Sequence, residues 1–228
     1  MTDKTSPRLI LSFGQKEILT DATTAYVRAT LDRLLPALAM PDSEAFDFVE
    51  QARIDAQAGM TWDSAPLDDE ADDLANGLMQ EFFDYQQFLK RQVRDFAFAA
   101  LFHLLERTVR KILMEANRTY GGAVLKTEKD TKSFKGMLSV LARCGYVTDE
   151  QPFARDLHKL NLISNAIKHG HGHSLTKLSK EFPDLFLHRE PNEPLVLDHL
   201  FLTPELLRQL AASVAAFWGA FPAQQFKN

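Results

Sequence analysis

The chain has 228 residues, of which 45% are hydrophobic and 25% are charged, and its one cysteine is Cys144. This composition is ordinary for a folded globular protein, and a single cysteine excludes an intramolecular disulfide and fits a reducing compartment. The sequence has no charged N-terminal segment followed by a sustained apolar run, and no long uninterrupted apolar stretch. We therefore expect no secretory signal, no membrane-spanning helix and a cytoplasmic location.

The charges are distributed unevenly along the sequence. Residues 42–96 contain fourteen acidic and four basic residues, a net charge of −10, whereas residues 126–180 contain ten basic and five acidic residues, a net charge of +5. An acidic chain is a poor general binder of nucleic acid, but a local basic region can still attract phosphate. Solvated helix faces would also explain most of these charges.

The N-terminal part predicts an acidic helical extension over residues 1–66. Apolar residues recur at helical spacing from about residue 15 to residue 38, and Pro36 is expected to end or kink this first helix. A second helix is predicted to begin near Asp42 or Ser43, which are good N-cap residues. The stretch 59–66 then reads as a linker and as the boundary between two domains.

The remaining residues, 67–228, predict a helical bundle. No proline occurs between residues 67 and 119, so we expect two long helices there, or one helix with a bend between about 88 and 92. Residues 96–102 are apolar on almost all sides, as in a central bundle helix, and Gly121 and Gly122 predict its end.

Four further segments complete the predicted bundle. Helices are expected over 132–143, 151–169 and 174–182, and the last helix begins at Thr203 and Pro204, a capping residue followed by proline. Between them, residues 185–202 contain two prolines and a short apolar run, which predicts an irregular segment or a short β segment. The expected fold class is therefore all-α.

The helix expected to end at His169 carries the best candidate for chemistry. At 100° per residue its apolar side chains form one stripe, and His158, Leu162, Asn165 and His169 fall on the opposite side. An amide and an imidazole that are neighbours on one face could hold a phosphate and move a proton. A solvated polar face, or a contact face for another helix, would produce the same pattern.

The run from Leu160 to Gly170 resembles the signature helix of HEPN domains, in which an arginine and a polar residue, often asparagine, precede a histidine near a helix end. Asn165 and His169 match the asparagine and the histidine. The resemblance covers about residues 85–220. It implies an all-helical bundle, often dimeric, and a metal-independent endoribonuclease in which His169 and Asn165 are catalytic and no cofactor is needed. It also suggests a toxin–antitoxin or anti-phage defence setting.

One position departs from this family pattern. Ser164 stands where the arginine is expected, and a serine cannot make the bidentate contact of a guanidinium with a phosphate. Lys168, or an arginine from elsewhere such as Arg155 or Arg107, could take the place of the missing arginine. The residues expected to bind RNA phosphate are Lys168, His158 and Lys159. The expected partners are RNA and a second copy of the chain in a homodimer, with a further protein partner as another candidate.

Two other functions remain open from the sequence. The missing arginine favours a non-catalytic HEPN-like module that dimerises or docks a partner. Alternatively, His169, His171 and His173 could bind a transition metal, although their spacing around glycines matches no standard zinc module, and no metal site is expected. The same run also resembles the asparagine-bearing helix of histidine-kinase-type ATPases, but the glycine-rich nucleotide loops of that family do not follow it.

Overall fold

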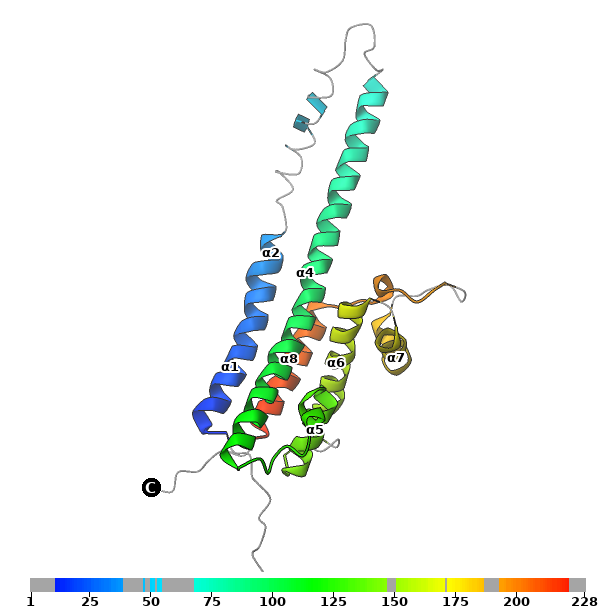
Figure 1. Cartoon of the computed structure of the whole chain (residues 1–228). Coiled ribbons are helices and arrows are strands. Elements are labelled where there is room, and N and C mark those ends of the chain that lie inside the picture. Colours follow the sequence, from blue (N-terminus) through cyan, green and yellow to red (C-terminus); the bar gives the residue numbers. More distant parts are fainter. Residues whose placement is uncertain are drawn as a thin grey trace, which may run out of the picture. The chain divides into compact units, whose positions relative to one another are not determined.

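Helices form the regular secondary structure of this protein. The computed structural model describes residues 11–38, 47, 50–51, 53–54, 68–146, 151–170, 172–186 and 193–221, and these residues contain no β-sheet (Figure 1). An antiparallel bridge joins Phe186 to Leu200. The all-α prediction is therefore confirmed. Within the described part of the chain, no helix is both long and apolar enough to cross a bilayer.

The chain divides into two compact units. One contains residues 1–29 together with 95–228, and the other contains residues 30–94. The domain boundary predicted after residue 66 and the linker predicted at 59–66 lie outside the described residues. They stay predictions. The start of the helix predicted near Asp42 lies outside the described residues as well.

The first helix, α1 (Phe13–Ala29), begins with a reciprocal cap. The backbone N–H of Ser12 donates to Gln15 Oε1 at 3.0 Å, and the backbone N–H of Gln15 donates to Ser12 Oγ at 3.2 Å. These two bonds satisfy donors that a helix start otherwise leaves unpaired. In the larger unit α1 packs against α8 (Pro204–Gly219), and the Tyr26 hydroxyl donates to the carbonyl of Ala97.

Pro36 ends the first helical stretch, as its position predicts. The smaller unit begins with a π-helical turn, Thr30–Leu34, which is followed by the one-turn helix α2 (Leu35–Ala37) with Pro36 near its start. A proline lacks the N–H of a normal helical residue and its ring crowds the preceding turn. A widened π turn is a common accommodation of such a disturbance, and the helix stops one residue after the proline.

Helix α4 (Asp68–Thr119) is one continuous helix of 52 residues. Of the two arrangements that the sequence allowed, the single helix is the one observed. Its last part, from residue 95, is the central helix of the larger unit, and its buried apolar residues are Ala97, Phe98, Ala99, Leu101, Phe102, Leu105, Val109 and Leu113. Gly121 and Gly122 both have positive φ angles, and the N–H of Gly122 caps the carbonyl of Asn117, so the predicted stop is confirmed.

Three more helices lie between this central segment and α8 in the sequence. They are α5 (Phe134–Arg143), α6 (Ala154–His169) and α7 (His173–Glu181), and α6 packs on both α7 and α8 (Figure 1). Side-chain caps start two helices: Ser133 Oγ accepts from the N–H of Gly136 before α5, and Thr203 Oγ1 accepts from the N–H of Leu206 at α8. Residues 183–186 and 193–202 contain two 3₁₀ turns, Pro183–Leu185 and Leu197–His199, and the Phe186–Leu200 bridge.

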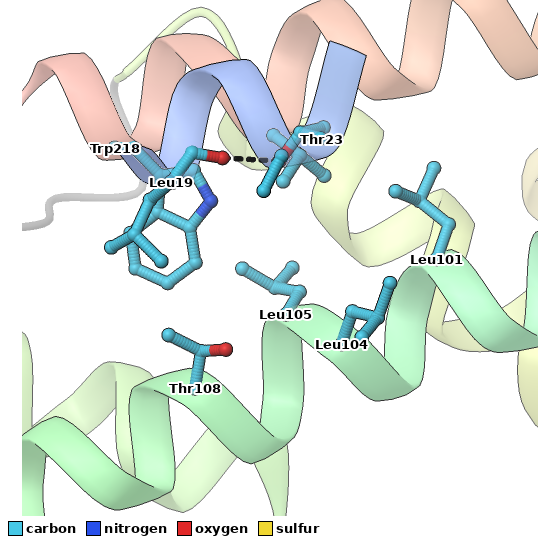
Figure 2. Close-up of a pocket in the computed structure, with 9 residues that line it drawn as sticks. Leu19, Thr23, Leu101, Leu104, Leu105, Thr108 and Trp218 are labelled. Atoms are coloured by element: carbon cyan, nitrogen blue, oxygen red, sulfur yellow. Dashed lines mark hydrogen bonds between the residues drawn. The ribbon is translucent and has the colours of Figure 1, made fainter. Parts of the chain in front are cut away.

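The core between α1, α4 and α8 contains a small apolar cavity of about 80 Å³ (Figure 2). Figure 2 shows Leu101, Leu105 and Thr108 of α4 on one side of it, with Trp218 and the α1 residues on the other. Thr23 does not leave a polar group exposed to this space, because its hydroxyl donates to the carbonyl of Leu19 at 2.8 Å. The volume is well below the roughly 300 Å³ at which small-molecule sites begin. The cavity is therefore a packing feature of the core.

Candidate functional site

Helix α6 is more deeply buried than its sequence predicts. Its apolar stripe includes Leu157, Leu160 and Ile163, all at most 1% exposed, but Leu162 on the predicted polar side is only 5% exposed. Of the two explanations that the sequence left open for this side of the helix, a contact face for another helix applies at Leu162. Helix α7 packs on α6, because the chain reverses direction at Gly170, whose φ of 65° is accessible to glycine at little cost. Ile167, which was expected in the core, is half-buried.

Ser164 lies inside the protein. Its exposed fraction is 0%, and its hydroxyl oxygen has no hydrogen-bond partner in the part of the chain that the structure describes. This is the position at which the HEPN signature carries arginine. A guanidinium attached here would need to leave water and lose its hydrogen bonds, which is far more costly than the burial of a hydroxyl. In this chain, position 164 belongs to the core rather than to an open phosphate site.

Asn165 is partly buried and is already engaged within α6. Its amide nitrogen donates to the side-chain oxygen of Asn161, one turn earlier, at 2.9 Å. This bond fixes the orientation of the Asn165 amide. Among the described residues, this is the one hydrogen bond of the Asn165 side chain, so its second amide N–H remains as a donor for a phosphate oxygen.

His158 and Lys159 lie at the other end of the helix and have protein partners. His158 Nε2 is 2.8 Å from Glu181 Oε2 on α7, and this hydrogen bond holds the pKa of Glu181 below its ordinary value. The Lys159 ammonium lies 3.7 Å from Asp156 and 4.9 Å above the ring of Phe182, and its side chain is 12% exposed. Eleven residues separate His158 from His169, about 16 Å along a helix axis. The structure therefore does not bring these two predicted phosphate ligands together with His169.

Lys168 and His169 are exposed in the last turn of α6. The Lys168 ammonium lies 5.9 Å from the centre of the Phe102 ring on α4. Among the described residues, no carboxylate forms an ion pair with Lys168, and His169 has no hydrogen bond or ion pair. Both side chains are therefore available to a ligand.

The structure adds His103 of α4 to this end of α6. Partial burial lowers the pKa of His103, the positive charge of Lys168 lowers it further, and Glu106, 3.7 Å away, acts in the opposite direction. The imidazole of His103 is consequently neutral at neutral pH. We call Lys168, His169 and His103 the α6 C-terminal surface. His103 was not predicted, because 65 residues separate it from Lys168 and no local sequence pattern marks their proximity.

A metal site at the histidine loop is not tested. His171 lies outside the described residues, and the described residues include no group of three histidine, cysteine or acidic side chains that could hold a metal ion. Comparison with known proteins found no matching family model, no similar curated protein and no similar solved structure.

Proposed function

We propose that this chain is a HEPN-like helical protein that binds RNA, and that the α6 C-terminal surface contacts RNA phosphate. The observation that carries this proposal is the exposed Lys168 ammonium, which has no carboxylate partner among the described residues and lies beside the exposed imidazole of His169. Cations are suited to phosphate oxygens, and Lys168 and His169 lie within the sequence region 126–180, which carries a net charge of +5.

The Lys168 side chain also has a structural role, which the test must separate from RNA binding. Backbone carbonyls at the end of a helix carry partial negative charge, so the Lys168 ammonium stabilises the last turn of α6 by a few tenths of a kcal/mol, up to about 1 kcal/mol. A substitution that removes this charge therefore changes the free energy of unfolding slightly even without RNA.

Cleavage of RNA is the second candidate function, and one observation favours it. His103 is held neutral beside an ammonium, and a neutral imidazole can accept a proton from a 2′-hydroxyl, while a second imidazole, His169, can protonate the leaving oxygen. Such chemistry needs no metal. It would also operate without the family arginine, whose position is buried here.

The experiment measures binding of a fluorescent single-stranded RNA to the full chain at several salt concentrations. We expect Lys168→Gln with His169→Gln to weaken binding and to lower the slope of log affinity against log salt by about 0.7 for each lost phosphate contact. Lys111→Gln is the charge-matched control, because this lysine is 76% exposed on α4 and lies outside the surface. RNA affinity that is equal in both variants, or undetectable in the wild type, would refute the proposal.

Cleavage is measured in the same samples with a chelator present. If the second candidate is correct, His103→Ala and His169→Ala each abolish cleavage in the presence of chelator, while Lys111→Gln cleaves as the wild type does. If the wild type binds RNA but leaves it intact, the protein is an RNA-binding module without nuclease activity.

A further inference from the structure

A second surface feature, separate from the α6 C-terminal surface, is a groove beside the end of α4. Its volume is about 610 Å³, which falls within the range of small-molecule binding sites. Helix α4 contributes Met114 and Asn117, and the segment that follows it contributes the rest: Leu125, Lys126, Thr127, Thr131 and Lys132. We call these seven residues the lysine groove.

The wall of the lysine groove is held in place by two side chains that bind its backbone. Asn117 Oδ1 accepts the N–H of Val124 at 3.2 Å and the N–H of Leu125 at 2.9 Å. Asp130 Oδ2 accepts the N–H of Lys126 at 2.8 Å. Val124 is 3% exposed and anchors the segment in the core. The groove is therefore largely preformed, which reduces the entropy cost of binding a ligand.

Asp130, a carboxylate of the segment that forms the groove, is paired with a residue outside the groove. Asp130 pairs with Arg143 at 2.8 Å, and its bonds to the backbone N–H of Lys126 and to Arg143 hold the pKa of its carboxyl below the ordinary value. Among the described residues, neither Lys126 nor Lys132 forms an ion pair. Two exposed ammonium groups thus line one groove, and no described carboxylate is paired with either of them.

The other lining groups indicate what an anionic ligand would carry besides its charge. Met114 is 53% exposed, so a large apolar side chain lies open at the groove, and Leu125 adds a second one. Among the described residues, the amide N–H₂ of Asn117 has no acceptor, since only its oxygen is bonded. Methionine packs adaptably against flat rings, and an amide can bond the polar edge of a base. A bare phosphate would use the lysines and leave these groups without contacts.

We infer that the lysine groove binds a nucleoside phosphate, with the phosphate between Lys126 and Lys132 and the base against Met114 and Leu125. The ligand is either a free nucleotide or one nucleotide of an RNA strand. This site shares no residue with the α6 C-terminal surface. It therefore does not depend on the RNA-binding proposal made for that surface.

The test titrates the full chain with AMP, UMP, adenosine and inorganic phosphate, and follows binding by calorimetry and by backbone and side-chain amide NMR. We expect AMP or UMP to shift the Asn117 side-chain resonance and the amides of Val124 and Leu125. We expect Lys126→Gln with Lys132→Gln to weaken nucleotide binding at least tenfold, whereas Met114→Ala weakens nucleotide binding and leaves phosphate binding unchanged. Lys129→Gln is the matched control, because Lys129 is an exposed lysine of the same segment that does not line the groove.

A short single-stranded RNA provides the arm that separates the two sources of the ligand. If the oligonucleotide shifts the same Asn117, Val124 and Leu125 resonances and mononucleotides do not, the ligand is a nucleotide within a strand. The inference is overturned if neither ligand perturbs these resonances, or if the Lys126/Lys132 variant binds both ligands as the Lys129 variant does. If the Lys168/His169 variant loses RNA binding but keeps these resonance shifts, the result supports the proposal for the α6 C-terminal surface and leaves the lysine groove intact.

Discussion

Replacement of Ser164 by alanine should stabilise the protein, because the serine hydroxyl is buried without a partner. A buried hydroxyl that loses its bonds to water and gains none costs about 1–3 kcal/mol. Alanine also has a higher helix propensity by up to about 0.7 kcal/mol, while removal of one oxygen atom leaves only a very small void. The expected gain in the free energy of unfolding is therefore about 1–2 kcal/mol, and the melting temperature should rise by about 2–4 °C for each kcal/mol.

The assay is urea unfolding followed by circular dichroism, with Ser139→Ala as the matched control. Ser139 is an exposed serine of α5 whose hydroxyl donates to the carbonyl of Lys135, so its replacement should change stability by less than about 0.5 kcal/mol. Ser164→Arg, which introduces the arginine of the HEPN signature, should instead lower the free energy of unfolding by more than about 4 kcal/mol, because it buries an unpaired charge. A Ser164→Ala protein less stable than the wild type, or a Ser164→Arg protein of normal stability, would refute this reasoning.

Three further predictions follow from the same structure. The pKa of the His103 imidazole should lie below its ordinary 6.5 and should rise in Lys168→Met, as measured by NMR. Because the folded state has the lower pKa, His103 lowers the free energy of unfolding as the pH falls below 6.5 and leaves it unchanged above that pH. Leu105→Ala should lower the free energy of unfolding by about 3–5 kcal/mol, because Leu105 is 1% exposed and lies beside an existing cavity. Leu104 is 51% exposed, so Leu104→Ala should lower it by less than about 1 kcal/mol in the same unfolding assay. We also propose a homodimer with its interface near His169; sedimentation at micromolar concentration should show a dimer, and monomer alone would count against it.

The parts of the fold that were predictable from the sequence are those with local causes. Thr203 followed by Pro204 marks the start of α8, because a hydroxyl cap and a proline in the first turn are both favoured at a helix start. Gly170 marks the end of α6, because its positive φ is unfavourable for other residues. The π turn before Pro36 was not predictable in detail. A proline indicates that the regular α-helix is interrupted, but it does not indicate whether the backbone forms a kink, a π turn or a helix end.

The burial of Ser164 had a local signal that the sequence interpretation did not use. Ser164 follows Leu160 by four residues and Leu157 by seven, and this spacing places it beside the apolar stripe of α6. Alignment with a family motif assigned it to an active site instead. Helical geometry alone assigns it to the core, which agrees with its 0% exposure.

Other features of the candidate site depend on contacts between residues that are distant in the sequence. The pairing of His158 with Glu181 requires α7 to fold back along α6, and nothing in either helix alone predicts that register. The approach of Lys168 to Phe102 and His103 depends on how α6 packs against α4. Single-sequence periodicity identifies which face of a helix is apolar, but it does not identify the neighbouring helix.

The positions of the three signature residues constrain how this chain could act on RNA. Position 164 faces the core, the Asn165 amide is bonded to Asn161, and only His169 is fully open to a ligand. A phosphate at this end of α6 must therefore be held by groups outside the signature, and Lys168 is the exposed cation nearest in sequence. Any proton transfer that accompanies cleavage needs a second titratable group as well, and His103 has the neutral state that a general base requires. Cleavage that survives His103→Ala but not His169→Ala would thus indicate that the second group comes from elsewhere, such as the second copy in a dimer.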